Sequence, residues 1–129
     1  MTNIDIMHKI LSNLKAKYKL LEEMHRCTKD MENALGKNDE NTFGQLMDTR
    51  KRLMDAVDVI SGENLRLADT LPQGNKENTK YILSGKNLGV AQGNPLETAM
   101  AEAQKRISLL MKRLVNDNST VDRLLRTKK

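Results

Sequence analysis

The chain is poor in cysteine and in aromatic residues. It has one cysteine, Cys27, no tryptophan, and only Tyr18, Phe43 and Tyr81 as aromatic residues. A single cysteine excludes an intramolecular disulfide and fits a reducing compartment. With so few rings among 129 residues, the interior must consist mainly of aliphatic side chains and methionine, which suits packed helices.

Signals for secretion or membrane insertion are also missing. The N-terminus carries Asp5 where a signal peptide needs positive charge, and no apolar run approaches the roughly 18 residues of a membrane span. We therefore expect a cytoplasmic protein without a membrane span.

No pattern of catalytic or ligand-binding residues occurs. His8 and His25 are too far apart to share a metal-binding turn, and the glycines within 85–93 do not follow a phosphate-binding order. Arg50 is the only basic residue at a core-facing position of the helical patterns, and no converging pair of acids accompanies it. The sequence predicts no enzyme, no metal site and no cofactor.

Apolar residues recur every three or four positions, which is the spacing of one helix face. In the first segment they are Ile4, Met7, Leu11, Leu14, Tyr18, Leu21, Met24, Cys27, Met31 and Leu35. In the second they are Phe43, Leu46, Leu53, Val57, Ile60, Leu67 and Leu71. Between the segments, Gly36 offers a left-handed C-cap and Asn38 or Asp39 an N-cap. Residues 1–71 therefore predict a long antiparallel, coiled-coil-like hairpin with helices at about 3–35 and 39–71.

Two polar residues, Arg50 and Asn64, share the spacing of the second segment. Buried polar groups at such positions can fix the register of packed helices. Alternatively, the helix rotates so that Met47, Met54 and Leu65 fill the seam and Arg50 and Asn64 reach solvent. The eight methionines likewise fit either a gap-filling core or an adaptable binding face.

A connector and a third helix follow. Residues 72–95 hold both prolines and four of the seven glycines, which predicts a connector with one helical turn around 81–83. Asn94, Pro95 and Glu97 form an N-terminal capping pattern for a basic amphipathic helix over 96–129. Four poor helix formers at 116–119 suggest a break in it. The expected fold is all-α and resembles a three-helix bundle.

The first 71 residues resemble a known family. The turn 34–39 and the second-helix stretches 43–47, 50–54 and 63–67 are similar to those of flagellar type III export chaperones of the FlgN and FliT kind. The resemblance implies a small cytoplasmic protein whose C-terminal amphipathic helix binds the terminal helices of hook-associated or filament-cap subunits before export. The client-binding residues that it implies here are Met100, Ile107, Leu110, Leu114, Val121 and Leu124. The basic net charge of +5 departs from the family, many members of which are acidic.

Three functions remain open at this point. The first is a non-enzymatic helical adaptor, most like an export chaperone, whose basic flanks select an acidic client helix. The second is a structural coiled-coil or scaffold protein, in which the third helix closes a bundle; a homodimer is compatible with either. The third is a basic tail that binds nucleic acid or a membrane surface. Specific nucleic-acid recognition is not expected, because aromatic residues are absent from the basic region.

Overall fold

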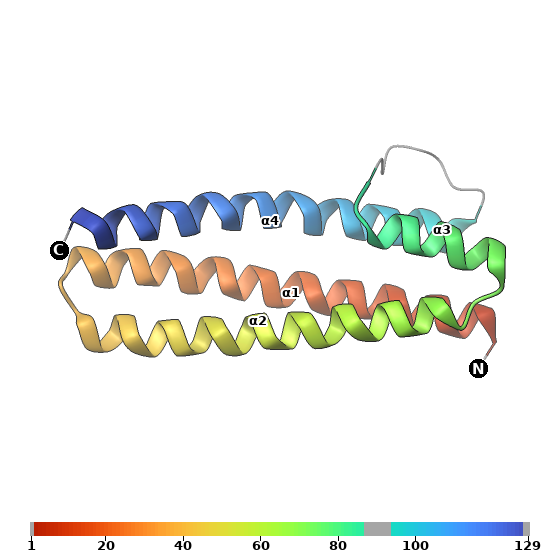
Figure 1. The fold of residues 1–129 in the computed structure, drawn as a ribbon, viewed down its shortest axis with the longest axis horizontal. Helices are drawn as coiled ribbons and strands as arrows, with labels where there is room; N and C mark the ends of the chain where they lie inside the picture. The colour runs from red at the N-terminus through yellow and green to blue at the C-terminus, as the bar shows by residue number, and fades with distance from the viewer. Residues whose placement is uncertain (1, 87–93, 128–129) are drawn as a thin grey trace.

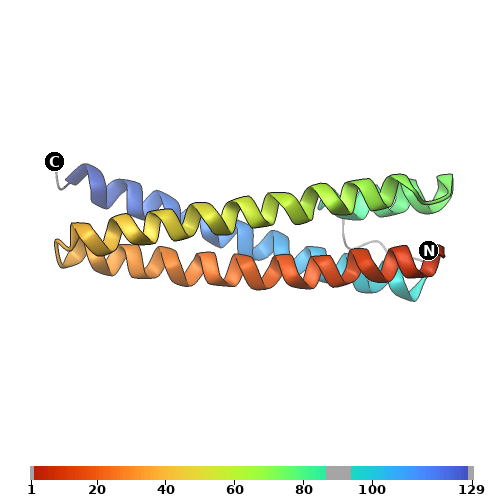
Figure 2. The same cartoon turned by 90° about the horizontal axis from the view of Figure 1, so that it is seen from below.

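The computed structural model describes residues 2–86 and 94–127, which form four helices. They are α1 (Asn3–Gly36), α2 (Glu40–Asp69), α3 (Gln73–Leu83) and α4 (Pro95–Thr127). The three long helices run side by side, with α2 antiparallel to α1 and α4 parallel to it (Figures 1 and 2). The described residues contain no strand. The predicted all-α helical bundle is confirmed.

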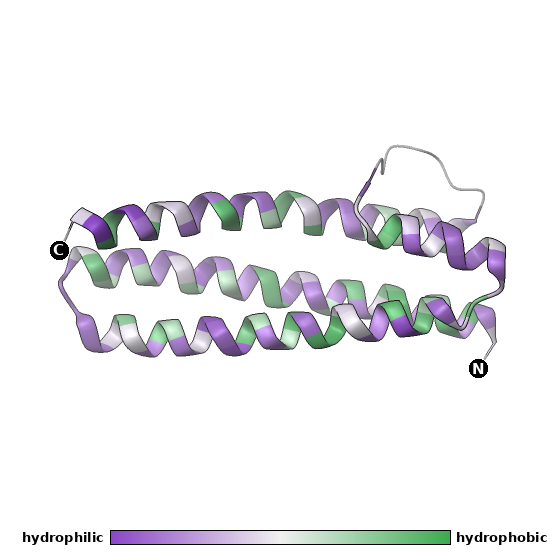
Figure 3. Cartoon of the chain, viewed as in Figure 1, coloured by the Kyte–Doolittle hydropathy of each residue, from purple (hydrophilic) through white to green (hydrophobic). Residues whose placement is uncertain are grey.

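The central helix of the bundle is α1. It packs against both α2 and α4, whereas within the described residues the backbones of α2 and α4 do not come into contact with each other. Because α1 has two neighbours, its buried face is wider than a single stripe. Ile6 and Ile10 are buried, while Ile4, which the periodicity assigned to the core, is exposed. Figure 3 shows apolar and polar residues alternating along each helix, as amphipathic helices require.

The turn between α1 and α2 uses different residues from those expected. Gly36 is the last residue of α1, and the left-handed conformation lies at Asn38, with φ of 56°. Asparagine tolerates this region because its short polar side chain can form local hydrogen bonds. Asp39 caps α2 as predicted, since its carboxylate accepts a hydrogen bond of 3.1 Å from the Thr42 backbone N–H.

The predicted connector is more helical than expected. Residues 73–83 form α3, an 11-residue helix instead of one turn. Pro72 directly precedes it, where a missing N–H costs nothing, and Thr79 and Ile82 bury one side of the helix against the bundle. Gly85 follows with φ of 77°, a conformation that favours glycine. Residues 87–93 of the predicted connector lie outside the described residues.

The break predicted at 116–119 is wrong, because α4 continues from Pro95 to Thr127. The polar side chains there have partners that leave the helical backbone intact. Asp117 lies beside His25 and Lys29, and Asn118 accepts a hydrogen bond from Arg50. The hydroxyls of Ser119 and Thr120 donate to carbonyls one turn earlier in α4. Contacts with distant segments thus override the poor helix propensity.

One of the two polar seam residues is buried. Asn64 is 2% exposed, and its side-chain oxygen accepts a hydrogen bond of 3.0 Å from the Asn13 amide of α1. The arrangement in which Asn64 reaches solvent and Met47, Met54 and Leu65 fill the seam is therefore wrong. The buried pair is satisfied only in one register of α1 against α2, so it specifies how the two helices align.

We predict that Asn64→Leu destabilises the protein by about 1–3 kcal/mol, because the Asn13 amide stays buried without its acceptor. Replacing both residues by leucine removes both polar groups at similar volume and should restore most of the loss. Urea unfolding monitored by circular dichroism measures both changes. A single variant as stable as wild type would show that the hydrogen bond does not hold the register.

Candidate functional site

The space between α2 and α4 is filled at one end by α3. This short helix packs against α2 and α4, and buries Thr79 and Ile82 there. It ends before the middle of the long helices, where Leu83 borders a small cavity of about 90 Å³ together with Leu14, Asn64 and Gln104. Because α3 has 11 residues and the long helices have 30 to 34, only about a third of the length of the bundle has a fourth helix (Figure 1).

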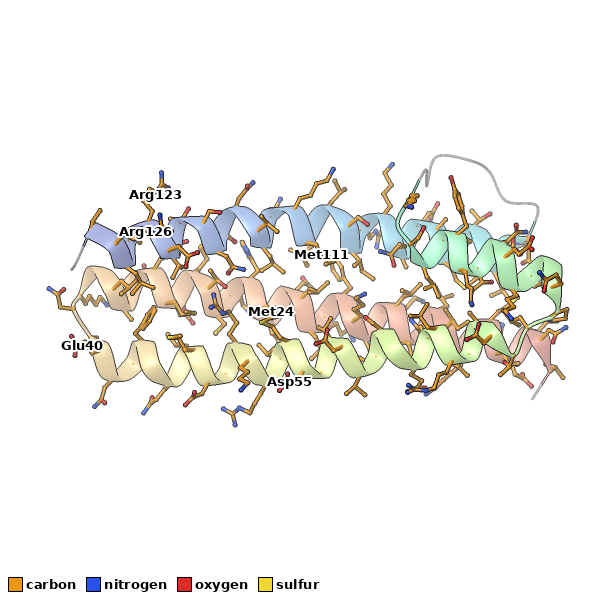
Figure 4. The ribbon with its side chains drawn as sticks, viewed as in Figure 1. Met24, Glu40, Asp55, Met111, Arg123 and Arg126 are labelled. Carbon is orange, nitrogen blue, oxygen red and sulfur yellow. The ribbon has the colours of Figure 1, made fainter. Side chains whose placement is uncertain are left out.

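Beyond the end of α3 the same space is open. A cavity of about 210 Å³ lies over α1 and between α2 and α4. Its floor is Leu21 and Met24 of α1, and its lining is predominantly apolar. We call it the α2–α4 groove; its walls are Met54, Val57, Asp58, Met111, Leu114, Val115 and Asn118. Figure 4 shows Met24 on α1 and Met111 on α4 in the middle part of the bundle.

Large apolar side chains stand exposed on both walls of the groove. Met54 is 49% exposed, Met111 45% and Val115 63%. Met47 and Leu65 are also exposed; Met47 lies two helical turns before Met54 on the same face of α2, and Leu65 borders the cavity at the end of α3. Single exposed apolar residues are ordinary, but a continuous set along a concave surface indicates a binding site.

The far end of the groove is crossed by a polar contact. The Arg50 guanidinium of α2 donates a hydrogen bond of 2.9 Å to the Asn118 side-chain oxygen of α4. Asn118 is also the last lining residue of the groove on α4, and Met111 is the first. These two residues are seven positions apart, which corresponds to about 10 Å of helix.

A second polar contact holds α4 to α1 near the same level. The His25 Nδ1 lies 2.6 Å from one Asp117 carboxylate oxygen, and the Lys29 ammonium lies 3.4 Å from the other. Asp117 is buried in the interface and is one of three polar residues on the buried face of α4, with Glu97 and Gln104. Burying a carboxylate without a partner is costly, and the contacts with His25 and Lys29 offset that cost in the docked position of α4.

The residues predicted to bind a client lie mostly in the core. Met100, Ile107, Leu110, Leu114 and Val121 are buried, and only Leu124 is partly exposed. In this arrangement they pack in the bundle; Leu114 lies at the edge of the groove, and Leu110 borders a separate cavity beside Tyr18. A client could use the whole stripe only if α4 left α1, and that role stays a prediction.

Sequence reasoning missed the groove residues on α4. Met111 and Val115 lie beside the predicted stripe of α4 and did not belong to it. Two signals were available in the sequence. One is the excess of methionine, and the other is the choice of Arg50 and Asn64, or of Met47, Met54 and Leu65, for the seam. Once Asn64 is buried, Met54 and Leu65 must face outward.

The described residues offer no clustered ligands for a metal ion. They contain no cluster of three or more histidine, cysteine or acidic side chains that could hold a metal ion. Burial lowers the pKa of Lys17, whose side chain borders the small cavity beside Leu83, and Asp58 partly opposes this effect. None of the described helices combines the length and apolar character needed to cross a bilayer. The chemistry of the groove is therefore that of an apolar contact surface.

Cys27 reports whether the end of α4 is docked. It is buried in a small cluster with Met31, Leu35 and Val121, and its thiol donates to the Leu46 carbonyl oxygen at 3.2 Å. Burial raises the pKa of this thiol, and nearby Arg50 opposes the rise. Fewer thiolates at neutral pH and a covered sulfur atom both slow alkylation.

We predict that iodoacetamide at neutral pH modifies Cys27 at least about a hundredfold more slowly in the folded chain than in urea, because labelling requires local opening. Because the folded pKa is raised, the rate should also continue to rise at higher pH than in the unfolded chain. Mass spectrometry over time measures the rate. Equal rates in the folded and unfolded chains would show that α4 does not cover Cys27.

The groove, its exposed methionines and the docked α4 are the observations on which a functional assignment can draw. Comparison with known proteins adds nothing to them: the chain matches no protein-family model, no curated protein and no solved structure at a significant level.

Proposed function

We propose that this chain is a non-enzymatic, cytoplasmic helical adaptor of the export-chaperone kind, which holds an amphipathic client helix in the α2–α4 groove. The observation that carries the proposal is the apolar groove beyond the end of α3, with Met54, Met111 and Val115 exposed on its walls. A client helix there would complete a four-helix bundle that α3 completes only at the other end.

The dimensions of the groove fit about two turns of a client helix. The lining residues Met111 to Asn118 span about 10 Å of α4, and a client helix there would contact the exposed Met54, Met111 and Val115 on the two walls. Such helix-in-groove recognition uses apolar anchors at i, i+3, i+4 and i+7 of the client.

The methionines suit the groove to more than one client sequence. Methionine is unbranched and polarizable, so it repacks against differently shaped partners at little cost. Met24, Met54 and Met111 come from three different helices and border one cavity. This arrangement supports the earlier alternative that part of the methionine content forms an adaptable binding face.

The identity of the client rests on the resemblance of residues 1–71 to flagellar export chaperones. On that basis we propose the terminal helices of hook-associated or filament-cap subunits as clients. Covering the apolar stripe of such a helix would keep the subunit from assembling before export. The groove supports the proposed mode of binding, and the resemblance alone suggests which proteins bind.

The burial of the α4 stripe favours a second candidate function. If α4 is permanently docked and the groove has no client, the protein is a structural or scaffold bundle. Met100 and Ile107, in the first half of α4, are each 0% exposed, so this part of α4 is packed tightly in the bundle. The two functions differ in whether a helix binds to the groove.

We predict that Met54→Asp combined with Met111→Asp weakens binding of hook-associated or filament-cap subunits by at least about tenfold, because two charges enter the apolar contact. Both residues are about half exposed, so the bundle should stay folded. Purified subunits titrated against labelled chain, with binding read by fluorescence anisotropy, test this. Val59→Asp is the matched control, because Val59 is an exposed apolar residue of α2 outside the groove lining.

Undiminished binding by the folded double variant would remove the groove as the client site. If no subunit binds the wild-type chain, the proposal of a flagellar client is wrong.

Sedimentation velocity tests whether the groove is filled by a second copy of the chain. A wild-type dimer that the double variant dissociates would show that the groove is filled by a second copy of the chain.

We also predict that a bound client leaves Cys27 as slow to alkylate as in the free chain, because the client occupies the groove while α4 stays docked. Faster alkylation in the complex would show instead that the client replaces α4 on α1. In that case the stripe from Met100 to Leu124 would be the contact surface, as the resemblance implies.

A further inference from the structure

A second groove lies between α1 and α4, on the other side of α4. A cavity of about 450 Å³ has Leu11, Leu14, Tyr18 and Ala103 among its apolar lining residues. A neighbouring cavity of about 210 Å³ shares Tyr18 and adds Leu109 and Leu110. We call the two together the Tyr18 groove.

The Tyr18 groove is separate from the α2–α4 groove. On α4, Arg113 borders the first and Val115 the second. Two residues correspond to about 200° around a helix, so these side chains point to opposite sides of α4. The proposal below therefore stands independently of the client-binding function.

Four cations line the Tyr18 groove. Lys15 and Lys19 lie on the α1 wall, and Arg106 and Arg113 lie on the α4 wall. None of them has a carboxylate within ion-pair distance among residues 2–86 and 94–127, in contrast to Lys29, Lys76 and Lys80. Unpaired charges on both walls of an apolar cavity indicate an anionic partner that brings the missing carboxylates.

The part of the Tyr18 groove that carries the four cations is short along the helix axis. His25 of α1 faces Asp117 of the parallel α4, so residue n of α1 lies near residue n+92 of α4. In this register Glu102 lies at about the level of Ile10, and Glu22 lies just beyond Arg113. The two acids border opposite ends of the groove, about 18 Å apart along the helix axis.

These features favour a short acidic protein segment over a polyanion or a membrane. A nucleic acid strand continues its phosphates past both ends of the groove, where Glu22 and Glu102 would repel it. A membrane surface is broad, whereas Tyr18 lies in a concave site between two helices. An amphipathic peptide of two to three turns fits both the length and the apolar floor.

We infer that the Tyr18 groove binds a short acidic, amphipathic segment of a partner protein. Apolar side chains of the segment pack on Tyr18, Leu11 and Leu110, and its carboxylates pair with the four cations on the walls. Because these charges are at the surface, they add specificity and association rate more than affinity, and their contribution falls as salt rises.

The test uses two synthetic peptides of about 12 residues, long enough for three helical turns. One carries a leucine stripe flanked by glutamates, and the other has glutamine in place of every glutamate. Fluorescence anisotropy against the full chain should show the glutamate peptide binding at least about tenfold more tightly than the glutamine peptide at low salt. Equal binding of the two peptides would overturn the proposal.

A matched pair of variants locates the site. Arg106→Glu with Arg113→Glu should weaken binding of the glutamate peptide by at least about tenfold. Lys105→Glu with Lys112→Glu makes the same change of charge one residue earlier on α4, at exposed positions outside the groove lining, and should change binding less than about threefold. Equal losses in both variants would show a non-specific effect of net charge and overturn the site.

Circular dichroism checks that each variant is folded. If the Arg106→Glu with Arg113→Glu variant is unfolded, Arg106→Gln with Arg113→Gln replaces it.

Two further probes test whether a nucleic acid or a membrane binds the groove better than an acidic peptide does. A single-stranded oligothymidylate and vesicles containing phosphatidylserine are titrated against the wild-type chain. Weaker binding than that of the glutamate peptide supports a protein partner. Tighter binding of either one, lost in the Arg106 and Arg113 variant, would overturn that assignment in favour of nucleic acid or membrane.

Discussion

The simultaneous packing of α2 and α4 on α1 is the interaction on which the rest of this structure depends. Because α1 separates its two neighbours, the described backbones of α2 and α4 do not come into contact, and the faces that they turn toward one another are covered only where another segment lies between them. Toward the N-terminal end of α1, α3 provides this cover as far as Leu83. Beyond Leu83 the described chain has no fourth helix, and Met54, Met111 and Val115 stay exposed, so the groove follows from three long helices combined with one short helix.

In the same arrangement, α4 lines a groove on each of two opposite sides. One side contributes Met111 and Val115 to an apolar groove with mixed polar edges, and the other contributes Arg106 and Arg113 to a basic one. Since the two grooves lie on opposite sides of α4, the proposed client helix and the proposed acidic segment would not exclude each other. The burial of Ile107 keeps α4 in place as the wall that both grooves share.

Much of the fold follows from local patterns. The three- and four-residue spacing and the cap at Asp39 are sufficient to predict the long hairpin, because each depends only on neighbouring residues. Features that depend on distant contacts could not be predicted in this way. Asp117 and Asn118 stay helical because of His25, Lys29 and Arg50, which lie far away in sequence. The groove depends on where α3 ends, and no periodicity encodes that point. The two polar seam positions allowed two arrangements, and only the hydrogen bond between Asn13 and Asn64 decides between them.

The central claim is that α4 is a fixed part of the bundle and that the α2–α4 groove, not α4 itself, is the vacant surface. Hydrogen exchange followed by mass spectrometry tests this most directly, because it measures how often each helix opens. Amides over 107–121 of the free chain should be as protected as those of α1 around Met24, and should stay protected when a client is bound. Rapid exchange over 107–121, comparable to that of the chain ends, would contradict the account and show that α4 is free to bind a partner.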